Sequence, residues 1–364
     1  MYDAAKEASS LYDDVNRYAA ALGCHFCAVK DLCGGIHCRA SLMDCYDHCC
    51  GGKSDCTIVC KFNHNFPIQH SEIAGFNLDN VPLTPCPPTE PMRSIATLIY
   101  HGSKRRLPVA ESTVAFRLAD LINFKEGTCR FKTRQCLNEH FGIDNSCKII
   151  VTGVDHDERI EPIWKMEELR IGAFLAIAGL EIASISPPNF STVLNVPRTD
   201  NMHSMKRIAI VHEEMCRAGL PAALHVNGRT ETDFLRWAKY IKERAFIDTL
   251  SYEFITGSGL GERLKQHCDW LIMIRDMVGR DLNIVARGNP MCIDYLSQNY
   301  NVTYIETTSF MKAMKRQKPI LRGNYGLRWM GESSGVSDCL STYLQVNMNA
   351  IQIALRTRYT GLSL

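Results

Sequence analysis

The chain has 364 residues, and 46% hydrophobic and 22% charged residues give it the composition of an ordinary globular protein. Its 41 Lys and Arg nearly balance its 39 Asp and Glu, which excludes a strong overall attraction to nucleic acid or membrane and confines any basic surface to a patch. No run of about 18 apolar residues occurs, so no segment is expected to span a bilayer and no membrane partner is expected.

The N-terminal region is expected to be a helix followed by a cysteine-rich metal-binding module. Residues 3–22 carry apolar side chains at helical spacing, and Gly23 ends that pattern. Nine of the 17 cysteines then fall between Cys24 and Cys60. Short Cys-x2–4-Cys steps place thiolates on adjoining turns, where they can converge on one tetrahedral ion. We therefore predict a metal-binding module within residues 1–66.

The cysteine spacing divides into two groups of four thiolates. The expected metal ligands are Cys24, Cys27, Cys33 and Cys38 for one site, and Cys45, Cys49 (or Cys50), Cys56 and Cys60 for the other. Two zinc ions are the cofactors that fit this donor set, and an iron–sulfur cluster is the alternative. Nearby histidines leave the ligand sets open, and free thiols without an ion are a third interpretation. The odd cysteine count and the absence of a leading apolar run indicate a reducing, cytoplasmic setting.

Residues 67–92 are rich in Pro, Asn and Thr, which predicts a linker or an extended strap on the next domain. Strand and helix patterns then alternate through a domain over residues 93–364. The predicted strands are 94–100, 148–154, 180–185, 222–226, 249–255, 282–286 and 302–306, with 319–322 as a further candidate. The predicted helices are 111–123, 163–178, 202–218, 231–243, 261–278, 291–299, 310–316 and 338–356.

Short strands separated by helices are typical of repeated βα units and a parallel sheet. The predicted fold class is therefore α/β, in the form of a (β/α)8-like (TIM) barrel preceded by the cysteine-rich module. A doubly wound open sheet is the alternative. No Gly-x-Gly-x-x-Gly follows the first strand, and this absence favours the barrel.

Polar side chains follow nearly every predicted strand, and in a parallel barrel the loops after the strands line one mouth. Asp155 and Asp157 come directly after a strand, where turn or N-cap aspartates are the alternative interpretation. Glu253 interrupts an apolar strand, so we expect it to be functional or paired with an arginine such as Arg287. His225 is either catalytic or a buried core histidine. The candidate catalytic residues are Asp155, Asp157, Glu253 and His225.

Other residues at the strand ends suit substrate or phosphate binding. They are Arg159, Asn189, Asn227, Arg229, Gly257, Gly259, Arg287, Glu306, Lys312 and Arg316. Gly257 and Gly259 precede a helix, where backbone amides and the helix dipole favour an anion, although a tight turn explains them equally well. Two basic patches, at residues 104–106 and 312–318, would be neighbours in a closed barrel and able to hold a phosphate backbone. Solvated surface charge is the alternative for each patch alone.

In architecture, residues 94–317 with the cysteine-rich module resemble the tRNA-guanine transglycosylase superfamily. That family joins a (β/α)8 barrel to a zinc site and exchanges a base with an aspartate nucleophile. The resemblance implies a transferase that carries out glycosyl transfer on a nucleic acid or nucleotide, with a carboxylate at the mouth as nucleophile or base. The family's zinc cysteines follow most of the barrel, whereas these precede it, so Asp155, Asp157 and Glu253 are chosen by position alone.

Two other functions fit parts of the sequence. Cys56-x3-Cys60-x-Phe62 is similar to part of the radical-SAM motif, but Asn63 stands where that motif has its third cysteine. A non-catalytic module that binds nucleic acid or protein is the other alternative. Such a module would have little need for mixed acids and bases at the mouth.

Overall fold

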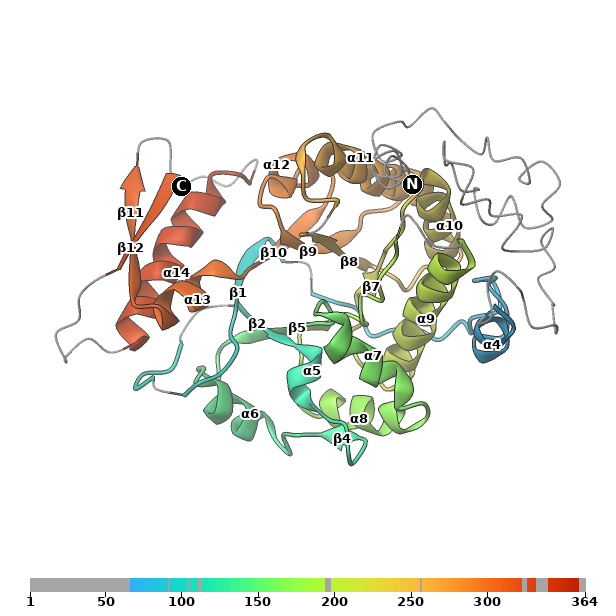
Figure 1. Ribbon diagram of the computed structural model, residues 1–364, viewed down its shortest axis with the longest axis horizontal. Helices are drawn as coiled ribbons and strands as arrows, with labels where there is room; N and C mark the ends of the chain where they lie inside the picture. The colour runs from blue at the N-terminus through green and yellow to red at the C-terminus, as the bar shows by residue number, and fades with distance from the viewer. Residues whose placement is uncertain are drawn as a thin grey trace, which may run out of the picture.

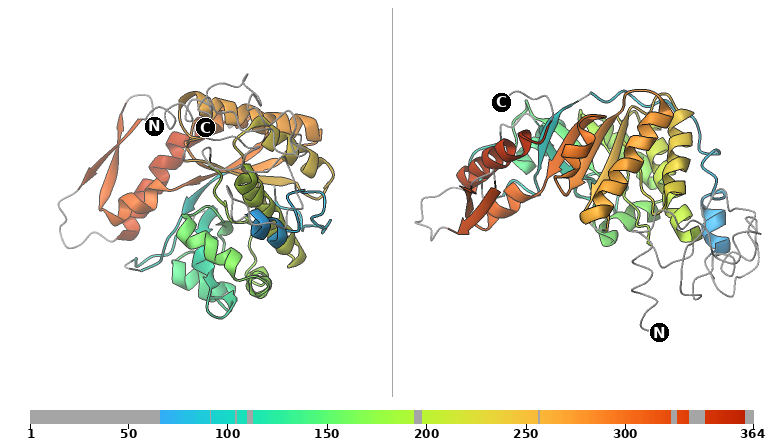
Figure 2. Two further views of the ribbon diagram at one scale, coloured as in Figure 1. Left: turned by 45° about the vertical axis from the view of Figure 1, so that its right-hand side comes forward. Right: turned by 90° about the horizontal axis from the view of Figure 1, so that it is seen from above.

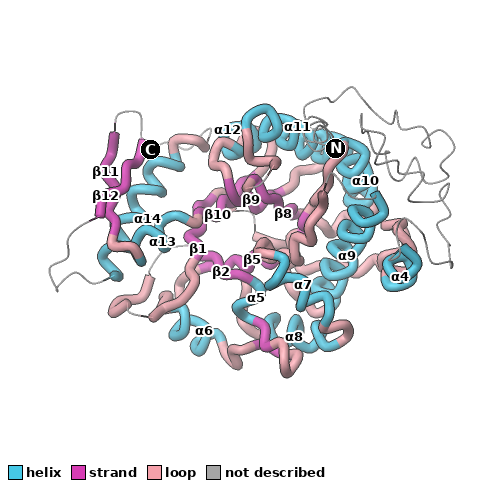
Figure 3. Tube along the Cα trace, in the orientation of Figure 1, coloured by secondary structure: helices cyan, strands magenta, loops and turns pink. Residues whose placement is uncertain are grey.

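The computed structural model describes residues 66–90, 92–103, 105–109, 113–193, 198–255, 257–322, 326–331 and 340–359. Within these residues, eight parallel strands form one sheet at the centre of the molecule, with helices outside it (Figures 1 and 3). The strands are β1 (Ser94–Leu98), β2 (Thr113–Arg117), β5 (Lys148–Thr152), β6 (Ser184–Ile185), β7 (Leu224–His225), β8 (Thr249–Phe254), β9 (Asn283–Gly288) and β10 (Asn301–Glu306). The predicted α/β class with a parallel sheet is confirmed.

The sheet is strongly curled. Its hydrogen-bonded order is β6-β5-β2-β1-β10-β9-β8-β7, so β1 pairs with β10, with Ser94 opposite Thr303. The two end strands approach each other, because Ile185 N donates to Pro221 O over 3.0 Å and Ala223 N donates to Ile185 O over 2.7 Å. Since all eight strands are parallel, their carboxyl ends lie at one edge of the sheet, which we call the mouth.

Helices follow the strands and cover the outer face of the sheet. They are α5 (Leu118–Leu121) and α6 (Arg134–Phe141) after β2, α7 (Asp157–Lys165) and α8 (Leu169–Ala178) after β5, α9 (Arg198–Arg217) after β6, α10 (Glu231–Lys242) after β7, α11 (Gly261–Val278) after β8, α12 (Cys292–Leu296) after β9, and α13 (Thr308–Met314) after β10. A short pair of strands, β3 (Ile122–Asn123) and β4 (Thr128–Cys129), separates α5 from α6. The chain continues into β11 (Gln317–Arg322), β12 (Gly326–Gly331) and α14 (Leu340–Arg356).

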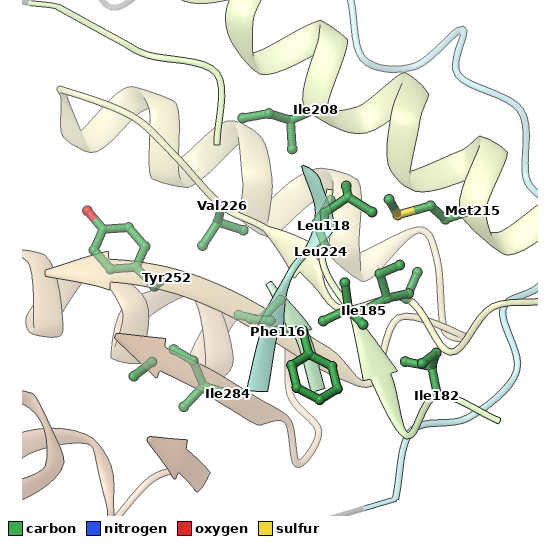
Figure 4. Close-up of a cluster of buried hydrophobic side chains, with 14 of the residues drawn as sticks. Phe116, Leu118, Ile182, Ile185, Ile208, Met215, Leu224, Val226, Tyr252 and Ile284 are labelled. Carbon is green, nitrogen blue, oxygen red and sulfur yellow. The ribbon is translucent and has the colours of Figure 1, made fainter. Parts of the chain in front are cut away.

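Buried apolar side chains sort into two clusters, one on each face of the sheet. The larger cluster includes Phe116, Leu224 and Tyr252 and fills the space between strands and helices (Figure 4). The smaller one consists of Ala96, Leu98, Ala115, Ile150, Val285 and Ile305. Because side chains alternate along a strand, the smaller cluster marks the concave inner face. Polar residues two positions further along those strands therefore point into the mouth from the same face.

The prediction of a helix over residues 111–123 is wrong, because β2 occupies residues 113–117 and, among the described residues 113–123, only Leu118–Leu121 are helical. Val114, Ala115 and Phe116 are all fully buried, so this strand has no polar face and lacks the period of two that would have identified it. The candidate strand at 319–322 lies in β11, which pairs antiparallel with β12 outside the main sheet. The predicted helix over 163–178 is two helices, interrupted at Glu167, whose φ is 48°.

Helix α4 (Phe66–Glu72) and the extended strap (Asn77–Glu90) lie against the rest of the domain. Gln69 of α4 donates to Asp200 of α9 over 2.8 Å. The strap then crosses the start of two strands, where Ala222 N donates to the Cys86 thiol over 3.1 Å and the Thr89 hydroxyl donates to Asp248 over 2.8 Å. Figure 2 shows α4 and the β11–β12 hairpin at opposite ends of the molecule.

Candidate active site at the mouth of the sheet

A cavity of about 590 Å³ opens at the mouth, a size within the usual range for small-molecule sites. Every one of the eight strands, or the loop after it, contributes to its wall. The lining side chains used below are Tyr100, Arg117, Asp155, His156, Asp157, Asn189, Ser191, Thr192, His225, Asn227, Arg229, Glu253, Ser258, Arg287, Thr307 and Met311. The cavity thus brings together all four predicted catalytic residues with Asn189, Asn227, Arg229 and Arg287.

Glu253 is a largely buried carboxyl group in the wall of the cavity. It lies near the end of β8 and accepts a hydrogen bond of 2.6 Å from the Asn189 side-chain amide. Burial raises the pKa of Glu253, and the charge of Arg287 and the Asn189 hydrogen bond only partly offset that effect. A carboxyl whose pKa is raised keeps its proton at a higher pH than an ordinary glutamate does, and it can release that proton to a substrate.

Arg287 stands directly opposite Glu253 in the paired strands β8 and β9. Its guanidinium donates to Val154 O over 2.6 Å, so it links the end of β9 to the loop after β5. The next residue, Gly288, has a φ of 112°, and a Cβ there would lie 2.3 Å from Phe254 O. Only glycine allows this close approach of the two strand ends, and it thereby sets the position of Arg287.

A second group of charges lies on the opposite side of the cavity, with alternating sign. Arg117 forms two hydrogen bonds with Asp120, over 2.7 and 3.0 Å, and Arg159 is also bonded to Asp120. The Asp155 carboxylate lies 2.8 Å from the Arg159 guanidinium and 3.7 Å from that of Arg117. Tyr100 lies beneath Arg117, 4.6 Å from ring centre to guanidinium carbon. Asp155 is therefore a fixed negative charge between two arginines, with a side chain only 6% exposed.

Asp157 is more accessible than Asp155 and lies in the first turn of α7. Its carboxylate accepts a hydrogen bond of 2.8 Å from the Ser191 hydroxyl. A carboxylate at this place also interacts favourably with the helix dipole, as the alternative interpretation from the sequence expects. Both roles are compatible with its place in the cavity wall.

The loop after β6 is held by residues that the sequence predicts to bind substrate. The Asn227 amide donates to Phe190 O over 3.0 Å, and Arg229 Nε donates to Thr192 O over 2.8 Å. Arg207 of α9 supports the same loop, with its guanidinium 4.0 Å from the Phe190 ring centre. Asn227 and Arg229 therefore use some of their hydrogen-bond donors to hold the cavity wall in shape.

His225 lies on the floor of the cavity and is almost completely buried, at 2% exposure. Burial lowers its pKa to about 3, so the imidazole is neutral at physiological pH. Its Nδ1 lies 3.4 Å from the Ser251 hydroxyl. A neutral imidazole here can exchange a hydrogen bond with a substrate, but it cannot supply positive charge.

Six predicted binding residues lie outside the cavity wall. Arg159 is one of them, and its guanidinium is paired with Asp155. Glu306 caps α13 by accepting hydrogen bonds from Thr308 N and Ser309 N. Gly259 is required by packing, because a Cβ there would lie 2.1 Å from Phe254 O. Gly257 lies next to it in the loop before α11. Lys312 and Arg316 belong to α13 and the residues after it, beyond the mouth.

In the first predicted basic patch, Arg105 is largely buried and donates to the carbonyls of His101 and Gly142, over 3.1 and 3.2 Å. Burial lowers its pKa to about 10. Arg105 is therefore a structural arginine and does not present its charge to a ligand.

Sequence reasoning missed Arg117, Tyr100 and the pair Ser191 and Thr192. Arg117 was hidden because its strand was predicted to be a helix. Tyr100 is the last residue of the predicted strand 94–100 and lies two residues after the end of β1, so the rule that polar residues collect after strands could have found it. No motif in the sequence marks Ser191 and Thr192, and they reach the cavity only because of the path of the loop after β6.

All eight predicted cysteine ligands precede Phe66 and lie outside the described residues. In the part of the chain that the structure describes, no three His, Cys, Asp or Glu side chains are grouped to hold a metal ion. The seven cysteines in that part are free thiols. No described helix is long and apolar enough to cross a membrane.

Comparison of this chain with models of protein families, with curated proteins and with solved structures gives no match.

Proposed function

We propose that the mouth is the active site of an enzyme that transfers a glycosyl group on a nucleotide or nucleic acid, with Glu253 as the group that moves the proton. The observation that carries this proposal is the buried position of Glu253 at the cavity, with a raised pKa and with Asn189 and Arg287 beside it.

Two carboxyl groups in different surroundings suit this chemistry. A protonated Glu253 can give its proton to the departing base while the glycosidic bond breaks. Asp155, held between Arg117 and Arg159, supplies negative charge to the sugar carbon as positive charge develops there, and it can form a bond to that carbon as a nucleophile. In the second half-reaction an incoming base displaces Asp155 and returns a proton to Glu253. Asp157 is the alternative to Asp155 for this role.

The cations of the cavity favour a substrate with negative charge. Arg117, Arg229 and Arg287 all line the wall, and guanidinium groups bind phosphate oxygens in pairs. The Tyr100 ring next to Arg117 offers an aromatic surface against which a base can stack. A phosphate-bearing nucleotide unit meets both requirements.

We further infer that the curled sheet acts as a closed (β/α)8 barrel. The sequential order of the strands around the sheet and the hydrogen bonds from residue 185 to residues 221 and 223 support this inference. In that fold, catalytic groups collect at the carboxyl ends of several strands, as they do here. The cysteine-rich module would hold two structural zinc ions through its thiolates, a donor set that suits zinc, and would not take part in the proton transfer.

Base exchange can be tested directly. The protein is incubated with RNA, DNA or mononucleotides together with 15N-labelled nucleobases, and the products are digested to nucleosides for mass spectrometry. We expect label in one nucleoside, and a loss of about 10²- to 10⁴-fold in rate for Glu253→Gln. Glu262→Gln, a substitution at an exposed residue of α11, is the control and should keep full activity. Incorporation by Glu253→Gln at the wild-type rate would disprove the role of Glu253.

A further inference from the structure

We propose that the β11–β12 hairpin and the end of α13 form a nucleic-acid-binding surface that presents a polymer strand to the mouth. The surface, which we call the basic hairpin face, consists of Lys315, Arg316, Ile320, Arg328 and Met330, all exposed. The proposal rests on the proposed function for the identity of the substrate, and it narrows that substrate from a nucleotide unit to a nucleic acid.

The positive charge of the protein is concentrated in this part of the chain. Residues 307–364 contain eight Lys or Arg and two Asp or Glu, a net charge of +6. Residues 1–306 contain 33 basic and 37 acidic residues, a net charge of −4. From residue 307 to residue 331 there is no acidic residue at all. A near-neutral protein therefore carries a strongly basic C-terminal part, which is the electrostatic requirement for binding a phosphate backbone.

The pairing of β11 with β12 gathers the exposed residues on one side. Ile320 lies opposite Arg328, and Lys318 lies opposite Met330. Because side chains alternate, Leu327 and Trp329 point the other way, and both pack against the hydrophobic core. The outward side of the hairpin thus combines the exposed Arg328 with two flexible apolar side chains, Ile320 at 43% and Met330 at 48% exposure.

This face is held rigidly on the domain before any ligand binds. Asn347 of α14 is completely buried, and its amide donates to Ser309 O over 3.3 Å and to Gln317 O over 3.0 Å. The Lys312 ammonium lies 5.4 Å from the Trp329 ring centre and ties α13 to β12. A preformed surface loses little conformational entropy on binding, which favours its use as a docking site.

The basic hairpin face is connected to the mouth by α13. Thr307 and Met311, before and within α13, line the cavity, and the next residues of the chain lead directly to Lys315. Seven helical residues span about 10 Å. A strand whose phosphates lie on the hairpin therefore has one of its nucleotides within reach of the cavity.

The basic hairpin face and the cavity beside it favour nucleic acid, rather than an anionic membrane, as the binding partner. The nearby cavity has arginines and a tyrosine suited to one nucleotide, and a two-stranded ribbon is a known platform for nucleic acid. Vesicles of phosphatidylserine serve as the probe for the competing partner.

The test measures binding of a fluorescent 20-nucleotide RNA and DNA, single- and double-stranded, by anisotropy at several salt concentrations. The variant is Lys315→Gln/Arg316→Asn/Arg328→Gln; asparagine is chosen because residue 316 has a φ of 51°. The control is Lys132→Gln/Lys165→Gln/Lys242→Gln, which removes the same charge from exposed sites on other elements. A plot of log affinity against log salt has a negative slope. For single strands, we expect this slope to become less steep by about 2 in the variant and to stay unchanged in the control.

Equal slopes in the variant and the control would overturn the proposal. So would a variant that loses binding to phosphatidylserine vesicles but keeps its affinity for nucleic acid. Thermal unfolding of both triple variants confirms that they are folded. The Glu253→Gln variant distinguishes the proposed function from the basic hairpin face, because this variant should bind nucleic acid as the wild type does. If Glu253→Gln remains active, the proposed function fails while the basic hairpin face still stands on its binding data.

Discussion

The side chain of Asn189 joins Glu253 to the backbone of Asp155. Its amide nitrogen donates to the Glu253 carboxylate over 2.6 Å, and its oxygen accepts from Asp155 N over 3.2 Å. One amide thus connects the loops after β5 and β6 to the interior of β8. Because Asn189 contacts the carboxyl group of Glu253 and the backbone of Asp155, it links the positions of the two residues and lowers the pKa of Glu253 through its hydrogen bond.

Replacing Asn189 with leucine should shift the pH dependence of activity. A hydrogen-bond donor favours the ionised carboxylate, so its loss raises the pKa of Glu253 further. We expect the alkaline limb of the pH–rate profile, where Glu253 loses its proton, to move to higher pH. Ser258→Ala is the matched control, since the Ser258 hydroxyl donates to the backbone oxygen of Glu253. A profile that moves equally in both variants would contradict this role.

The stability of the Glu253→Gln variant should depend on pH in a defined direction. Since the pKa of Glu253 is raised above 4.5 in the folded protein, the folded state holds a proton that the unfolded state has released. Wild-type stability is therefore lost as pH rises from 4.5 through the folded pKa. Glutamine cannot ionise, so the variant should gain relative to wild type between pH 4 and pH 8. Thermal unfolding of both proteins at pH 4 and pH 8 measures this gain. A stability difference between variant and wild type that is the same at both pH values would refute the prediction.

Buried histidines should destabilise the protein in acid. Burial lowers the pKa of His212 to about 4 and those of His225 and His267 to about 3. The unfolded state takes up protons near pH 6.5 and the folded state does not, so stability falls as pH drops below 6.5, by about 1.4 kcal/mol per pH unit for each histidine.

His212→Gln isolates one of these groups. The imidazole Nε2 lies 3.3 Å from Ala222 O, a contact that a glutamine amide can replace. We expect the slope of unfolding free energy against pH, between pH 6 and pH 4.5, to decrease by about one proton in the variant. Urea titrations across this range provide the slope, and an unchanged value would show that His212 does not remain neutral.

Gly288→Ala should be much more damaging than Gly219→Ala. Both glycines have positive φ, 112° and 79°, but a Cβ at residue 288 would lie 2.3 Å from Phe254 O whereas residue 219 has open space. We expect about 1–2 kcal/mol of destabilisation at residue 219 from backbone strain alone. At residue 288 the overlap with the backbone of β8 adds to this and brings the loss to at least about 3 kcal/mol. Equal losses in denaturant unfolding would disprove the close approach.

The cysteine-rich segment should contain about two zinc ions per chain. Elemental analysis of the protein after gel filtration measures this, and anaerobic purification identifies the alternative, since an iron–sulfur protein is brown. Serine at Cys24 and Cys27 should remove one ion and leave the other. Loss of neither ion would contradict the assignment of these two ligands.

The sequence predicts most of the parallel strands well, because each of these segments consists of apolar, often β-branched residues followed by a polar residue at its carboxyl end. Glu253 and Asn189 were found by the same logic, since a carboxyl or amide at a strand end has few structural uses. Strand β2 was not predicted, because Val114, Ala115 and Phe116 are buried on both faces of the sheet and show no alternation of apolar and polar residues. The capping role of Glu306 could not be predicted, because a residue that caps a helix and one that binds a ligand look alike in sequence. It is recognised from the hydrogen bonds that Glu306 accepts from the backbone of residues 308 and 309.

The pairing of Ser94 with Thr303 has a consequence for the synthesis of the protein. A ribosome that adds about 5–20 residues per second needs roughly 10–40 s to make the partner of the first central strand. During that interval the unpaired edge of a nascent chain is open to association with other chains, and a prematurely terminated product would keep it open. Chaperone dependence during translation should therefore be strongest for chains that end before residue 301.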